Sequence, residues 1–128
     1  MISLNQKNYV KEAEDVISNL KRNNYNKIYL TTSQLRNVLA KVSSIYIDVN
    51  QNRNAVLTDK NQADIQYLKL QIVYASGRDE KGNVRDFVEK SKILKYIDEI
   101  GDSKEDFLLF ARYMEALVAY HKFQGGQE

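Results

Sequence analysis

The 128-residue sequence contains no cysteine, no proline and no tryptophan, and its single histidine is His121. Without cysteine the chain can form no disulfide, bind no metal through thiolates and use no cysteine nucleophile. With one histidine it cannot build a histidine-rich metal cluster. The lack of proline removes the residue that most strongly breaks helices, which suits a chain made mostly of helix.

Long apolar runs are also missing. No run approaches the roughly 20 apolar residues that cross a bilayer, and residues 1–16 hold no apolar core of the length found in secretory signals. We therefore expect a cytoplasmic protein that makes no membrane contact. A chain of this length is typical of one domain, so residues 1–128 are expected to form a single domain.

Apolar residues recur at helical spacing in five segments, which lie at about residues 8–22, 31–50, 59–76, 84–100 and 103–123. A short apolar triplet at residues 28–30 has no partner strand, so a packed connector is expected there. The sequence predicts an all-α fold, a compact bundle of about five helices.

Two of these helices begin with recognisable caps. Thr31 with Gln34 has the spacing of a capping box, and Ser103 with Asp106 has the same spacing with an acid in the second position. Gly77 is a natural residue to end the third helix.

Two helices carry more apolar positions than one stripe. In the third, Tyr67, Leu70, Val73 and Tyr74 cover much of the circumference outside the main stripe, which predicts a central helix. The fifth carries two apolar stripes, which predicts burial on two sides, either inside the bundle or against a partner.

Positive charge is concentrated between Leu20 and Arg53, while the rest of the chain is net negative. That stretch contains a single acid, Asp48, and six cations: Lys21, Arg22, Lys27, Arg36, Lys41 and Arg53. A positive field on one part of a balanced protein is the usual footprint of a phosphate-backbone partner.

The predicted second helix presents part of this charge as a strip. Asn37, Lys41 and Ser44 follow one another at i, i+4 and i+7, with Arg36 beside them. These donors suit phosphate and ribose oxygens. Because helical lysines and arginines are more often simply solvated, these residues alone slightly favour an all-α module that binds proteins over one that binds nucleic acid.

An enzyme is the least favoured interpretation. No glycine-rich phosphate loop is present, and His121 follows Val118 by three on an apolar stripe, as a structural histidine would. Asp98 and Asp102 have a spacing that could share a metal, but acids near helix ends are more often solvated. We expect no catalytic residue, no metal and no cofactor.

Three runs of sequence resemble one known family. Residues 107–123 (FLLFARYMEALVAYHKF) resemble the C-terminal signature of the small subunit of type III-A CRISPR effector (Csm) complexes. Residues 31–37 look like that family's second-helix opening, and residues 67–78 look like its middle helix. The resemblance extends from about residue 31 to residue 126, in the right order.

This resemblance implies a non-catalytic five-helix subunit of an antiviral RNA-guided complex. Copies would stack head to tail as a filament beside the backbone and large subunits, in contact with crRNA and target RNA. Whether the free protein is a monomer or a dimer stays open. The competing hypothesis is an all-α protein-binding adaptor that does not contact RNA.

The RNA contacts expected from sequence position come from three places. Arg36, Asn37 and Lys41 on the second helix are the first choice. Lys69 and Arg78 belong to the resembling middle segment, and Lys27 and Arg53 flank the basic stretch. Contacts from scattered cations would hold the sugar-phosphate backbone without reading bases.

Overall fold

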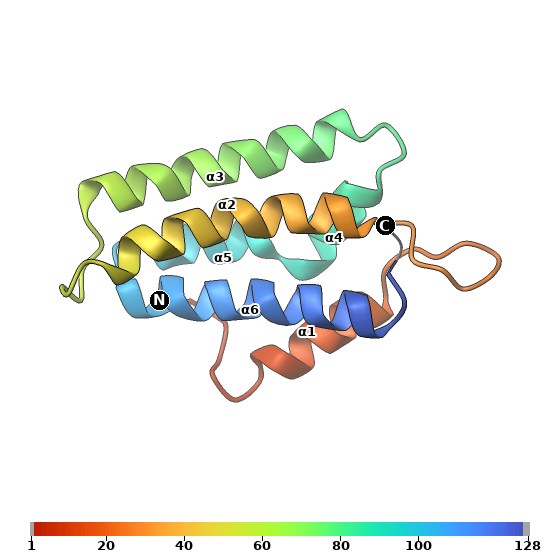
Figure 1. Ribbon diagram of the computed structural model, residues 1–128, viewed down its shortest axis with the longest axis horizontal. Helices are drawn as coiled ribbons and strands as arrows, with labels where there is room; N and C mark the ends of the chain where they lie inside the picture. The colour runs from red at the N-terminus through yellow and green to blue at the C-terminus, as the bar shows by residue number, and fades with distance from the viewer. Residues whose placement is uncertain (1, 127–128) are drawn as a thin grey trace.

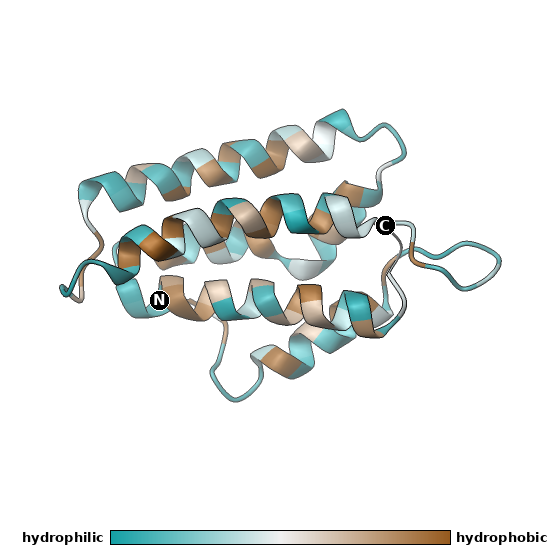
Figure 2. Cartoon of the chain, viewed as in Figure 1, coloured by the Kyte–Doolittle hydropathy of each residue, from teal (hydrophilic) through white to brown (hydrophobic). Residues whose placement is uncertain are grey.

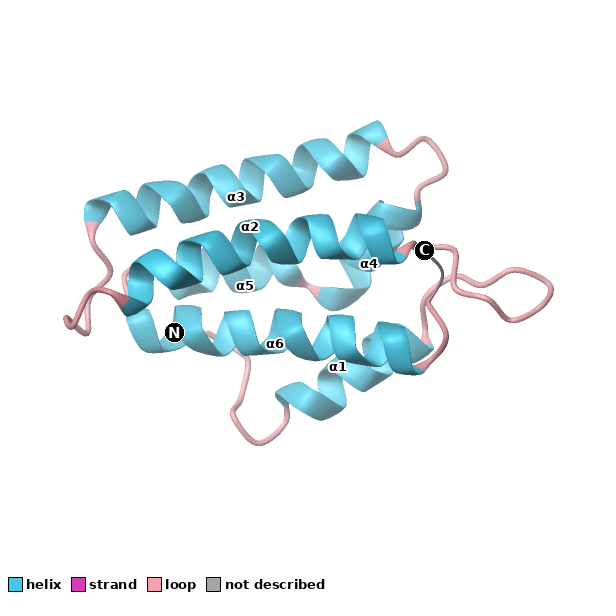
Figure 3. Cartoon of the chain, in the orientation of Figure 1, coloured by secondary structure: helices cyan, strands magenta, loops and turns pink. Residues whose placement is uncertain are grey.

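The structure, a computed structural model, describes residues 2–126 and contains six helices joined by loops (Figures 1 and 3). The helices are α1 (Tyr9–Ser18), α2 (Thr32–Asn50), α3 (Asp59–Arg78), α4 (Asn83–Ser91), α5 (Ile93–Ile100) and α6 (Lys104–Phe123). The described residues include no strand, only isolated bridges between Arg22 and Ile28 and between Val56 and Ser103. The all-α prediction is therefore confirmed.

Helix α6 lies at the centre of the bundle and packs against α1, α2 and α5. Its fully buried residues are Phe107, Phe110, Tyr113, Met114 and Leu117. The two predicted apolar stripes are thus used inside the bundle, except at Phe123, which is 83% exposed. Figure 2 shows hydrophobic (brown) and hydrophilic (teal) residues alternating along the helices.

Helix α3 lies at the edge of the bundle, so the prediction of a central helix was wrong. It buries Ile65, Leu68 and Ile72 on the side that meets α2, α4 and α5. Its other apolar side chains are exposed: Tyr67, Leu70, Val73 and Tyr74. An apolar residue count cannot show how many neighbours a helix has, and here α6 already fills the centre (Figure 1).

Both predicted helix caps are present. The Thr31 hydroxyl accepts the Gln34 amide at 3.1 Å, and the Gln34 side chain accepts the Thr31 amide at 3.0 Å, which completes a capping box. The Ser103 hydroxyl accepts the Asp106 amide at 3.2 Å. The Asp106 carboxylate accepts the backbone amide of Ile2 at 3.1 Å, and so holds the N-terminal segment against α6.

The segment predicted as one helix over residues 84–100 is divided at Lys92 into α4 and α5. Lys92 adopts the left-handed conformation, with φ of 61°. Just before it, the Ser91 carbonyl accepts the Tyr113 hydroxyl of α6 at 2.8 Å. Burial raises the pKa of Tyr113, so this hydroxyl stays protonated and needs an acceptor. The break supplies that acceptor, and no helix-breaking residue in the sequence announces it.

Two other helix ends differ from the predictions. Helix α1 ends at Ser18, four residues before the expected end at Arg22. The Arg22 guanidinium donates back to the Ile17 carbonyl at 3.1 Å. Gly77 does not end α3, which continues to Arg78.

The connector between α1 and α2 is packed at one end, as predicted, since Ile28 and Leu30 are buried. The ring of His121 reaches it from α6, with Nε2 2.7 Å from the Leu30 carbonyl oxygen. His121 is itself buried, and a Cβ at Gly126 would overlap its ring. The interpretation of His121 as a structural residue is confirmed.

We predict that Lys92→Gly stabilises the protein by about 1 kcal/mol, because glycine adopts the left-handed conformation without the cost borne by other residues. Lys92 is exposed, so little packing is lost. Urea denaturation measures the change. The matched control, Lys95→Gly inside α5, should instead destabilise by about 1 kcal/mol. Equal destabilisation by both variants would contradict the left-handed break.

Candidate functional site

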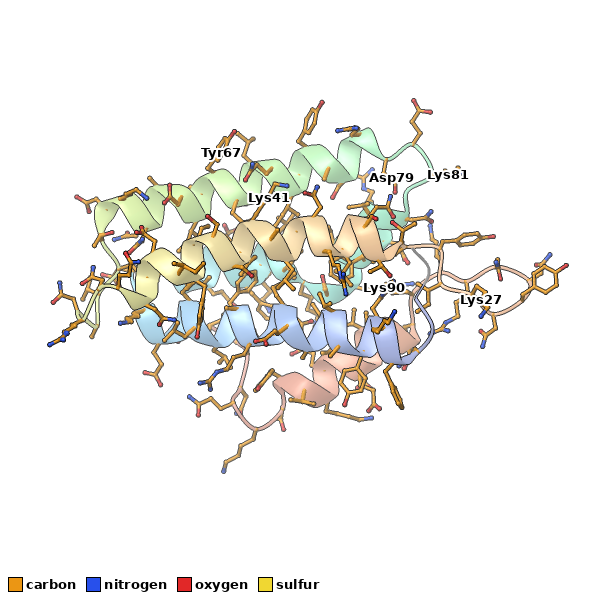
Figure 4. The ribbon with its side chains drawn as sticks, in the orientation of Figure 1. Lys27, Lys41, Tyr67, Asp79, Lys81 and Lys90 are labelled. Atoms are coloured by element: carbon orange, nitrogen blue, oxygen red, sulfur yellow. The ribbon has the colours of Figure 1, made fainter. Side chains whose placement is uncertain are left out.

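An open groove of about 1160 Å³ lies between α2 and α3. Residues from both helices line it, together with the start of the α3–α4 connection. From α2 these are Ser33, Gln34, Arg36, Asn37, Val38 and Lys41; from α3 they are Tyr67, Leu70, Gln71, Ile72, Tyr74, Ala75 and Arg78; beyond α3 they are Asp79 and Val84. Figure 4 shows Lys41 on α2 and Tyr67 on the neighbouring α3.

Four of the seven sequence-predicted residues meet in this groove. Arg36 and Asn37 come from one turn of α2, Lys41 comes from the next turn, and Arg78 comes from the last turn of α3. The Lys41 ammonium donates to the Asn37 amide oxygen at 3.1 Å, as the i, i+4 spacing allows. Arg36, Asn37 and Arg78 are exposed.

The groove cations have no acidic partner among residues 2–126, where all ion pairs involve other lysines and arginines. The single carboxylate in the groove lining is Asp79, and its Oδ2 accepts the Val84 amide at 2.8 Å. That bond satisfies a free amide in the first turn of α4. Arg36, Lys41 and Arg78 therefore give this part of the groove an excess of positive charge.

Farther along α2 and α3 the groove continues into a second hollow of about 500 Å³ whose charge is balanced. There the Lys60 ammonium lies 3.0 Å from the Asp64 carboxylate and 3.2 Å from that of Asp48. Hydrogen bonds to Asp64 and Asp48 raise the pKa of Lys60. Positive potential is therefore concentrated at the end of the groove that holds Arg36 and Arg78.

The other three predicted residues lie outside the groove. The Lys69 ammonium is 2.7 Å from the Asp98 carboxylate of α5. Lys27 lies in the loop before α2 (Figure 4). Arg53 lies in the loop after α2. The 19 residues of α2 separate these two loops by about 28 Å.

The basic stretch of the sequence is thus not one patch in the fold. Arg22 turns inward, where its guanidinium also donates to Gln124 Oε1 at 2.8 Å. Three separate places along the molecule hold the remaining cations: Lys27 lies in one, Arg36 and Lys41 lie in the groove, and Arg53 lies in the third. Chain proximity could not reveal this, because a 19-residue helix carries its two ends far apart.

Sequence reasoning missed that aromatic side chains share the groove with the cations. Tyr67 and Tyr74 line it and are 61% and 67% exposed. Both lie in a helix with apolar residues on all sides, which favoured burial. The only available signal was their seven-residue spacing, which places them on one face of α3.

The acidic side chains and the histidine of the described residues do not form a metal-binding cluster. Within residues 2–126 no three histidine, cysteine, aspartate or glutamate side chains come together to hold a metal ion. Asp98, one of the paired acids considered above, binds Lys69. No helix in the described part of the chain has the length and apolar character to cross a membrane.

Fold and groove together define a small helical-bundle protein with a cationic, aromatic surface groove. The family model described as Csm2 Type III-A matches residues 3–127. The chain belongs to the Csm2 family of type III-A CRISPR systems, which confirms the resemblance to the small subunit of Csm complexes.

Relatives named "CRISPR system Cms protein Csm2" are similar over most or all of the chain. The Streptococcus thermophilus protein is 44% identical over 128 residues, all of both chains. The Mycobacterium tuberculosis H37Rv protein is 40% identical over 122 residues, or 95% of each chain. The Enterococcus italicus protein is 38% identical over 96 residues, which are 73% of this chain and 67% of that protein.

We predict that Asp79→Ala lowers the free energy of unfolding by about 1 kcal/mol, because the Val84 amide at the start of α4 loses its acceptor. Asp79→Asn should cost less, since an amide oxygen can still accept that hydrogen bond. Urea denaturation of both variants provides the comparison. Equal stability of wild type and Asp79→Ala would show that this bond does not hold α4.

Proposed function

We propose that this chain is the non-catalytic small subunit of a type III-A CRISPR-Cas interference complex, acting in the cytoplasm in antiviral defence. It stacks with copies of itself beside the backbone and large subunits, and it holds crRNA and target RNA through the sugar-phosphate backbone. The observation that carries the RNA proposal is the grouping of Arg36, Asn37, Lys41 and Arg78 in one groove without acidic partners.

The chemistry of these side chains suits a phosphate backbone. Arginine presents a planar fork of donors that matches phosphate oxygens, and lysine acts as a point charge. Such contacts do not depend on base identity, as a subunit serving many guide sequences requires. Asn37 adds a neutral donor beside Lys41 that suits a ribose hydroxyl.

The seven candidate residues differ in how readily they can contact RNA. Arg36, Asn37, Lys41 and Arg78 face the groove and come first. Lys27 and Arg53 lie beyond opposite ends of α2, so they would contact a strand that runs past the helix. Lys69 comes last, because RNA binding would have to compete with Asp98 for its ammonium.

Exposed apolar side chains at both ends of the bundle support head-to-tail stacking. Tyr25 and Phe123 are 85% and 83% exposed at the end where Arg22 bonds to Gln124. Ile47 and Val56 are 61% and 55% exposed toward the opposite end, where Val56 bridges to Ser103. Apart from Phe123, the α6 stripes cannot serve this purpose, because the bundle already buries them.

The alternative function, an adaptor that binds protein without RNA, is favoured by one observation: Tyr67, Leu70, Val73 and Tyr74 leave an apolar face on α3. A protein helix could cover that face. Such a helix would also bury the groove cations, which have few carboxylates nearby to pair with. Because burying unpaired charges is costly, this alternative ranks second.

We expect the double variant Arg36→Glu/Lys41→Glu to weaken target-RNA binding by the assembled complex and to flatten its salt dependence. Each lost phosphate contact lowers the slope of log K against log salt by about 0.7 for a single strand. Filter binding from 50 to 300 mM salt, over which the Debye length falls about 2.4-fold, measures both quantities.

The control is Lys7→Glu/Lys95→Glu, which changes the net charge equally at two exposed lysines outside the groove. It should bind RNA nearly as wild type does. Unchanged affinity and slope in the groove variant, or equal losses in both variants, would contradict the RNA assignment of the groove. Circular dichroism confirms that each variant remains helical.

A further inference from the structure

We propose that Tyr67 and Tyr74 are stacking platforms for unpaired bases, so that the α2–α3 groove prefers single-stranded RNA to duplex. This inference rests on the proposed RNA function and deepens it: the cations would hold the backbone while the two tyrosines hold bases.

The two tyrosines have the placement that such platforms need. They lie seven residues apart on α3, on the same face, at about 10.5 Å along the helix axis. That distance is close to the rise of three stacked nucleotides at about 3.4 Å each. Leu70, 61% exposed, lies between them and continues the apolar surface.

The fold itself makes little use of these rings. The buried side of α3 is formed by Ile65, Leu68 and Ile72, and within residues 2–126 neither tyrosine hydroxyl has a protein hydrogen-bond partner. Tyr96 and Tyr113 behave differently: both are buried, and their rings pack edge to face at 5.5 Å. The tyrosines that pack in the core therefore differ from Tyr67 and Tyr74, which lie exposed in the groove.

Charge selects the occupant. Arg36, Lys41 and Arg78 line the same groove as the two rings, with Asp79 as the single acid in its lining. A cationic groove with aromatic side chains is the arrangement that binds single-stranded nucleic acid, because every base has a face that can stack. In a duplex those faces are already covered by neighbouring base pairs, so duplex RNA could use the cations only.

The test uses the full-length protein and two 12-nucleotide probes that share a backbone: uridine oligonucleotide and the same oligonucleotide with abasic sites. Fluorescence anisotropy at low salt gives both affinities. Wild type should bind the uridine probe more tightly than the abasic probe. Tyr67→Ala/Tyr74→Ala should lose about tenfold or more on uridine, and less than about twofold on the abasic probe.

Tyr29→Ala is the matched control, because Tyr29 is 49% exposed but lies outside the groove. It should retain the preference for uridine. If Tyr67→Ala/Tyr74→Ala still binds the abasic probe, this variant is folded and its groove cations remain in place.

The possible failures are distinguishable. If Tyr67→Ala/Tyr74→Ala binds the uridine probe as wild type does, or loses affinity for both probes equally, the stacking inference is overturned. The proposed RNA function survives that result as long as Arg36→Glu/Lys41→Glu weakens both probes. If wild type binds neither probe, or the charge variant changes neither affinity, the proposed function itself is overturned, and the stacking inference with it.

Discussion

The central position of α6 is the constraint on which the rest of the structure depends. Its aromatic and aliphatic residues fill the middle of the bundle, where α1, α2 and α5 pack around them. Burial of side chains of this size contributes roughly 1.5–3 kcal/mol each. With that place taken, α3 can pack from one side only, against α2, α4 and α5.

The groove follows from this arrangement. One face of α3 packs against its neighbours, and the rest of the helix surface is exposed at the edge of the bundle (Figure 1). Part of that exposed surface borders α2 and forms one wall of the groove. The strip of Arg36, Asn37 and Lys41 on α2 therefore faces open space next to Tyr67 and Tyr74 of α3. In the second hollow, Lys60 forms ion pairs with Asp48 and Asp64, so the charges there are balanced. The excess of positive charge is therefore confined to the part of the groove where the cations have no acidic partner.

Local signals in the sequence predicted much of the fold. The capping box at Thr31 and the cap at Ser103 are short-range interactions, and the structure contains both. No local signal predicted the break at Lys92, and the hydrogen bond that accompanies it comes from Tyr113, which lies 22 residues beyond Ser91 in the chain. The edge position of α3 also depends on a distant part of the chain, since it is decided by what α6 occupies.

The site was predictable to a similar degree. Asn37 and Lys41 share a face by helical spacing alone, with Arg36 beside them, and the sequence shows this directly. Arg78 joins them only through the packing of α3 on α2, and Lys69 is held apart by Asp98, a contact across 29 residues. Lys69 and Arg78 are both cations on α3, and contacts with residues distant in the chain decide which of them lies in the groove. The amino-acid composition does not reveal such contacts.

The most direct test of the groove's role is a cryo-electron microscopy structure of the assembled complex with target RNA bound. The account predicts RNA in the α2–α3 groove, with phosphate oxygens within hydrogen-bonding distance of Arg36, Lys41 and Arg78. A groove covered by a neighbouring protein subunit, with RNA on another face of the bundle, would contradict it.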